Sequence, residues 1–131
     1  MRDFKKLSVW AKAHELTLLV YRSTSSFPAN EMYGLTSQTR RAAASIGANI
    51  AEGCGREGDV DLARYLQIAM GSANELENHL LLACDLGFMA QDAYVATLES
   101  LGEVKRMLTG LLNRLRSIHH EARSSKLEAN S

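Results

Sequence analysis

The residues of this chain that could perform chemistry are concentrated in one segment, residues 38–53. Its polar side chains follow one another at steps of three and four residues: Gln38, Arg41, Ser45, Asn49 and Glu52. Because an α-helix repeats every 3.6 residues, this spacing places all of them along one side of a helix. Such a row of amide, guanidinium, hydroxyl and carboxylate groups could bind a ligand, or it could join one helix to its neighbours.

The same segment carries a second face made of small and branched apolar side chains. Ile46 and Ile50 lie four residues apart, with Ala42 and Ala43 at adjoining positions. This pattern predicts a helix that packs closely against several neighbours. We therefore interpret the segment as an assembly helix.

A structural role for the polar row makes specific predictions. Asn49 and Glu52 would tie down the loop that follows the helix, and Arg41 would pair with a carboxylate such as Glu75. We favour this role over direct ligand contact, because buried polar groups are usually satisfied within the protein. Such a network can also fix the partner and the register that a helix accepts.

Spacing argues against enzymatic chemistry. A di-metal bundle needs Glu-x-x-His pairs that face inward, but Glu75 is followed by Asn78 three positions later and by His79 four positions later. The glycines of residues 53–58 do not indicate a phosphate-binding loop, because they follow no predicted strand and precede no Gly-Lys-Ser/Thr. Cys54 is not a candidate nucleophile, because the sequence offers no recognisable base near it. We expect no catalytic residue, metal or cofactor.

Basic side chains form the other candidate site. Lysine and arginine bind nucleic-acid phosphates in a salt-dependent way, since each contact releases counterions. Aromatic residues make up only 6% of the chain, so we expect neither base stacking nor sequence-specific reading. The candidates for phosphate contact are Lys5, Lys6, Lys12, Arg40, Arg41, Arg106 and Arg116.

The formal net charge is zero, but the charge is unevenly distributed. Residues 1–51 carry seven Lys/Arg against three Asp/Glu, residues 52–92 carry two against eight, and residues 93–131 carry six against four. A single neutral subunit would bind phosphates weakly, whereas several subunits that present the same basic face would bind in parallel. The charges could also serve contacts between subunits, or belong to ordinary solvated faces.

Composition predicts one cytoplasmic helical domain. The chain has 131 residues, 46% of them hydrophobic, and a single proline. No apolar run approaches the roughly 20 residues that cross a bilayer, so we expect no membrane contact. Since no catalytic pattern is recognised, we also expect no small-molecule substrate. The two cysteines do not suggest a disulfide framework, and we expect reduced thiols, with Cys54 in a loop.

Apolar residues recur at steps of three and four, which predicts an antiparallel up-down-up-down four-helix bundle with shallow crossing angles. The last helix shows this rhythm from Leu101 through Leu111 to Ile118. Ser8 and Asp59 are the expected N-caps. The predicted helices are residues 7–23, 35–53, 59–87 and 91–119, which form one domain over residues 1–120. Residues 121–131 lose the apolar periodicity, and we expect a mobile tail there.

On these residues the chain resembles a known family, the four-helix-bundle proteins encoded in intervening sequences of bacterial 23S ribosomal RNA genes. The matching stretches are FKKLSVWAKA, FPANEMYGLTSQTRRAAASIGANIAEG and ARYLQIAMGSANELENHLLLACDLG, and the likeness covers residues 4–118. The positions that match the motif are Gln38, Arg41, Ser45, Asn49, Glu52, Gly53, Arg56, Ser72 and Glu75.

The resemblance implies a bundle that assembles into a ring, typically a homopentamer, and it implies no catalytic activity. A related branch comprises the accessory proteins of diversity-generating retroelements, which bind nucleic acid and a reverse transcriptase through basic surfaces. This chain differs from that branch in its zero net charge.

Two functions remain open from the sequence. The first is a ring-forming protein that binds structured RNA, or an RNA–protein partner, through basic residues of several subunits. The second is a protein-interaction scaffold without a nucleic-acid role, whose charges serve subunit pairing.

Overall fold

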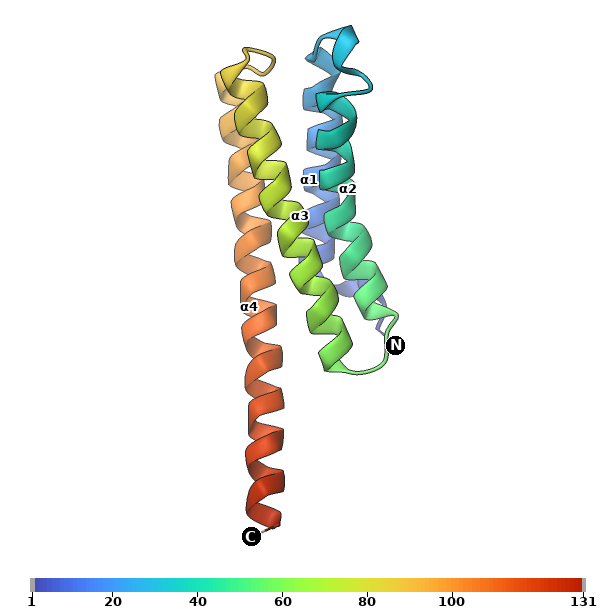
Figure 1. Ribbon diagram of the computed structural model, residues 1–131, viewed down its shortest axis with the longest axis vertical. Coiled ribbons are helices and arrows are strands. Elements are labelled where there is room, and N and C mark those ends of the chain that lie inside the picture. The colour runs from blue at the N-terminus through green and yellow to red at the C-terminus, as the bar shows by residue number, and fades with distance from the viewer. Residues whose placement is uncertain (1, 131) are drawn as a thin grey trace.

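The computed structural model describes residues 2–130, and within that range the chain contains helices and no strand. Three single-turn 3-10 helices, η1 (Phe4–Lys6), η2 (Thr24–Ser26) and η3 (Ala29–Glu31), lie before or after the first long helix. The four long helices (Figure 1) are α1 (Ser8–Ser23), α2 (Leu35–Cys54), α3 (Asp59–Asp85) and α4 (Gln91–Ala129). The prediction of an all-helical fold with four helices is confirmed.

Each long helix packs on two others, since α1 and α3 both contact α2 and α4. The most extensive of these contacts joins α2 to α3. In Figure 1 the α2–α3 connection lies at the same end as the N-terminus, and the α1–α2 and α3–α4 connections lie at the other end. The start of α1 and the end of α2 are therefore close to the start of α3.

The core consists of the side chains that the apolar rhythm predicts. On α3, Leu62, Leu66, Leu76 and Leu80 are at most 2% exposed, and each contributes roughly 1.5–3 kcal/mol by leaving water. The register on α4 differs late in the helix. Leu112 is buried while Leu111 is only half-buried, and Ile118 lies on the surface.

The helix starts differ from the predicted caps. Leu7 occupies the N-cap position of α1, and no side chain caps that helix, so the prediction for Ser8 is wrong. Before α3 the cap position belongs to Gly58, whose φ of 84° is favourable only for glycine. Asp59 is therefore the first residue of α3, where its carboxylate still favours the positive end of the helix dipole.

The last helix extends farther than the apolar pattern indicates. The predicted end was residue 119, but α4 continues to Ala129, and in Figure 1 it projects well past the other three helices. Residues 116–130 are all exposed. This extension has no core to cover, so its sequence loses apolar periodicity although the backbone remains helical. The mobility that we expect for residues 121–131 stays a prediction.

Candidate functional site

The polar row of α2 is joined to α3 by one pair of hydroxyl groups. The Ser45 Oγ and Ser72 Oγ atoms are 2.8 Å apart, within hydrogen-bonding distance. The side-chain amide of Asn49 donates to the Ser45 carbonyl oxygen at 2.9 Å and to Ser45 Oγ at 3.0 Å. Asn49 thus supports the Ser45–Ser72 contact, and it does not tie down the following loop as the sequence suggested.

Glu52 does fix the following loop, through Arg56. The Arg56 Nη2 atom donates to Glu52 Oε1 at 2.8 Å and to the Tyr65 hydroxyl at 2.9 Å. The hydrogen bond with Glu52 raises the pKa of Arg56. This chain of contacts runs from the end of α2 through the loop to α3. It requires a close approach of the two helices at Gly53, where an added Cβ would lie 2.9 Å from Tyr65 Cβ.

The remaining polar positions line an open hollow between α2 and α3. Gln38, Arg41, Ser45 and Glu75 surround a volume of about 390 Å³. The Glu75 Oε1 atom lies 3.4 Å from His79 Nε2. No ion pair joins Arg41 to Glu75 among residues 2–130, so the predicted pairing is wrong for the single subunit.

Two of the seven predicted phosphate contacts form hydrogen bonds or ion pairs within the subunit, and the Nζ atom of a third, Lys5, lies 6.0 Å from the Phe4 ring centroid. The Nε atom of Arg40 donates to Thr24 Oγ1 at 2.8 Å, and its guanidinium lies 4.9 Å from the Tyr21 ring centroid. Lys12 lies 3.5 Å from Glu15 and 3.7 Å from Glu103. These exposed ion pairs are worth little in stability, but they offset the charge of Lys12.

The predicted cations do not form one patch on the subunit. Arg40 contacts Tyr21 near the end of α1, whereas Lys5 and Lys6 precede the start of α1. The 16 residues of α1 span about 24 Å at 1.5 Å per residue. One group of cations therefore lies at each end of the bundle.

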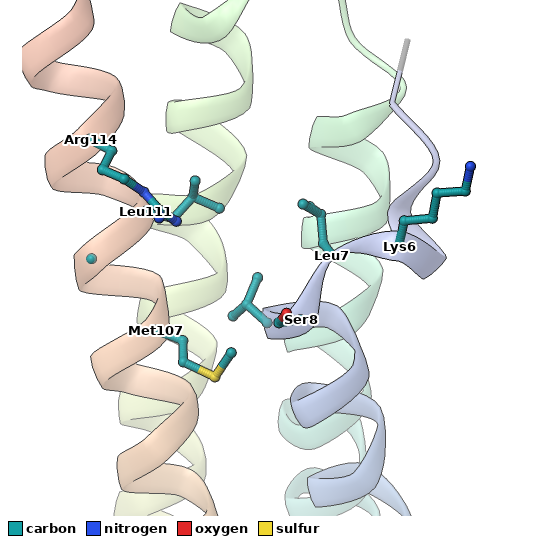
Figure 2. A pocket seen from close by; sticks show the side chains of 8 residues that line it. Lys6, Leu7, Ser8, Met107, Leu111 and Arg114 are labelled. Atoms are coloured by element: carbon teal, nitrogen blue, oxygen red, sulfur yellow. The ribbon is translucent and has the colours of Figure 1, made fainter.

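A hollow between the start of α1 and the middle of α4 adds a basic residue that the sequence reasoning missed. Its volume is about 560 Å³, and its apolar lining includes Leu7, Met107 and Leu111. Figure 2 shows Met107 and Leu111 on α4 facing the start of α1, with Arg114 one turn farther along α4. Lys6 lines the opposite rim. The signal in the sequence was Arg114 itself, three residues after Leu111 and two residues before the predicted Arg116.

The described residues hold no cluster of three or more His, Cys, Asp or Glu side chains that could bind a metal ion. Cys54 is the last residue of α2 and is fully buried, so its predicted loop position is wrong. Burial raises the pKa of its thiol, which disfavours the reactive thiolate. No helix within residues 2–130 is both long and apolar enough to span a membrane.

These features define an all-helical protein whose polar side chains join helices, and whose exposed cations lie mainly near the chain start and along α4. The family model for 23S rRNA-intervening sequence proteins matches residues 5–110. The chain belongs to that family. No curated protein matches the sequence significantly.

Among solved structures, the chain is similar to a protein of unknown function from the S23 ribosomal protein family of Bacteroides thetaiotaomicron. The likeness has a TM-score of 0.74 at 24% sequence identity, and it covers 80% of this chain and 95% of that chain. At this identity the comparison supports the fold alone. The family match ends at residue 110, so the last part of α4 lies outside it.

Proposed function

We propose that this chain is a non-enzymatic cytoplasmic protein whose up-down-up-down bundle assembles into a ring-shaped homopentamer and binds structured RNA. The phosphate-binding groups would be the exposed cations, contributed in parallel by several subunits. Parallel contacts raise the effective concentration of each site, which compensates for the zero net charge of one subunit.

The observation that supports this proposal is the distribution of ion pairs. Three carboxylates of α3 already have cationic partners: Asp59 pairs with Arg2, Asp61 lies 3.9 Å from Arg64, and Glu77 lies 2.8 Å from Lys105. In contrast, the α4 residues Arg106, Arg114 and Arg116 form no ion pair with any residue in the range 2–130. These three cations of α4 are therefore available to a ligand, although the net charge of the chain is zero.

The other exposed candidates are Lys5, Lys6 and Arg41, which also lack an ion pair within the described range. We assign a smaller share to Lys12 and Arg40, because both already contact groups of their own subunit. The membership of the chain in the 23S rRNA-intervening sequence family makes RNA the first ligand to test.

A gel-shift titration with a hairpin RNA tests the proposal. We expect binding at low salt that weakens by more than about tenfold between roughly 50 and 200 mM salt, because phosphate contacts release counterions. Absence of binding at the lower salt concentration, or an affinity that does not depend on salt concentration, would contradict RNA binding through phosphate contacts.

A scaffold without a nucleic-acid role is the second candidate, and one surface feature favours it. Large apolar side chains are exposed around the α3–α4 connection, where Leu81, Leu82, Leu86 and Val95 are 44–53% exposed. Exposed apolar surface of this kind is typical of protein contacts. These side chains could cover one another between subunits.

Charge reversal separates the two functions. The test is a double variant that carries Arg106→Glu and Arg116→Glu. If this variant keeps the particle mass in light scattering but no longer shifts RNA in a gel, RNA binding is supported. If the same variant loses the oligomer, and the wild-type protein shifts no RNA, the charges serve subunit pairing instead.

A further inference from the structure

The projecting part of α4, residues 116–129, carries its Lys and Arg residues on one side, together with His119. We call this segment the α4 arm. Arg116, His119, Arg123 and Lys126 follow one another at steps of three, four and three, which is the spacing that keeps residues on one helix face. The two acidic residues of the arm, Glu121 and Glu128, lie on the opposite face at 100° per residue.

The basic face of the arm continues the core-facing side of α4. His119 and Lys126 each come 18 residues, or five full helical turns, after the buried Leu101 and Leu108. Arg116 and His119 line a hollow of about 200 Å³ with Asp59, at the start of α3. The basic stripe therefore begins where α3 begins. The part of α4 that carries it projects past the end of the bundle (Figure 1).

Within residues 2–130, no carboxylate forms an ion pair with the lysine or arginines of this stripe. Asp59, the carboxylate that lines the hollow with Arg116, is paired with Arg2. No ion pair with any residue of 2–130 involves Arg116, Arg123 or Lys126. All residues of the arm are exposed, so the cations can contact a partner without any rearrangement of the bundle.

The arm suits a phosphate backbone better than unstacked bases. From Arg116 to Lys126 the stripe is about 15 Å long at 1.5 Å per residue, a length over which one strand of a DNA duplex places about four phosphates. The arm contains no Trp, Tyr or Phe, so it offers no aromatic platform of the kind that single-strand binding proteins use. It also grows from a helix already formed in the bundle, which removes the cost of helix nucleation.

From these observations we infer that the α4 arm is a nucleic-acid-binding element, which contacts the phosphate backbone of double-stranded RNA through Arg116, Arg123 and Lys126. This inference rests on the proposed RNA-binding function and assigns it to a segment beyond the family-matched region, which ends at residue 110.

The test compares two triple variants of the full chain with equal loss of charge. The arm variant carries Arg116→Gln, Arg123→Gln and Lys126→Gln. The control carries Arg22→Gln, Arg64→Gln and Lys105→Gln, at positions on the other helices or in pairs with α3 carboxylates. Glutamine is a good helix former, and circular dichroism and light scattering verify that helix content and particle mass are unchanged.

The probes are a hairpin RNA with a stem longer than one turn, a DNA hairpin of the same sequence, and oligouridylate. We expect the wild-type protein to bind the RNA hairpin most tightly. The arm variant should lose at least about tenfold in affinity for it, and its log–log salt dependence should flatten by roughly two to three, since each lost phosphate contact removes about one. The control should change affinity by less than about threefold.

The failures of the two proposals give different results. If wild-type protein binds the RNA hairpin in a salt-dependent way and the arm variant binds equally well, the arm is not the contact, while the proposed function stands. If wild-type protein binds no RNA, the proposed function itself fails. If the wild-type protein binds the DNA hairpin with higher affinity than the RNA hairpin, the assignment to RNA is overturned. If the arm variant loses particle mass, the arm contacts another copy of the chain.

Discussion

The close approach of α2 and α3 at Gly53 gives the sharpest stability prediction, for Gly53→Ala. An added Cβ would lie 2.9 Å from Tyr65 Cβ, 3.0 Å from Leu62 Cδ1 and 3.4 Å from the Leu62 carbonyl oxygen. Two of these atoms are at or close to the backbone of α3, so the two helices must separate by several tenths of an ångström. Overpacking of this kind costs about 1–3 kcal/mol.

The cost is partly offset, because alanine is more favourable than glycine inside a helix by roughly 0.5–1 kcal/mol. We expect Gly53→Ala to destabilise the protein by about 1–2 kcal/mol net, which lowers the melting temperature by several degrees. Gly71→Ala is the matched control. A Cβ at Gly71 meets nothing within 4 Å, so that variant should gain about 0.5–1 kcal/mol within the subunit.

Urea unfolding followed by circular dichroism, at one protein concentration for all variants, measures both changes. Unchanged m-values would show that the free-energy differences belong to the folded state. If Gly53→Ala were as stable as the wild-type protein, or if both alanine variants gained stability equally, the argument from tight α2–α3 contact would be refuted.

Three further predictions concern Cys54 and the hydroxyl pair of Ser45 and Ser72. Because Cys54 is buried and its thiol pKa is raised, a thiol reagent at pH 8 should label one thiol of the native protein, Cys84, and both thiols in urea; equal rates for the two would contradict the burial of Cys54. The raised pKa of Cys54 also means that the folded state holds the thiol proton more tightly than the unfolded state does. The stability that this difference contributes is present below the unfolded thiol pKa of about 8.5, and it is lost as the pH rises through the pKa of the folded state. A Cys54→Ala variant should therefore lose less stability than the wild-type protein between pH 8 and 10. For the hydroxyl pair, a double-mutant cycle of Ser45→Ala and Ser72→Ala should give a coupling free energy of about 0.5–1.5 kcal/mol in urea unfolding, and strictly additive effects would show that the 2.8 Å contact contributes nothing.

The amount that sequence reasoning recovered differs between the core and the candidate site. The three-and-four rhythm of leucines on α3 predicts a buried stripe, and Leu62, Leu66, Leu76 and Leu80 are buried, because burial is the main reason for that rhythm. The rhythm gives no information where there is nothing to bury. This is why the helical continuation of α4 to Ala129 escaped prediction, although the cations there keep a helical spacing.

The sequence by itself determined the helical class, the apolar faces and the row of polar residues on α2, because these depend on composition and on periodicity along one chain. Only the tertiary structure decided which of those polar groups meet. Ser45 meets Ser72, Arg40 donates to Thr24, and within residues 2–130 Arg41 forms no ion pair with the suggested Glu75. Such pairings depend on the rotation and separation of neighbouring helices, which packing across the whole core sets and which no local pattern encodes.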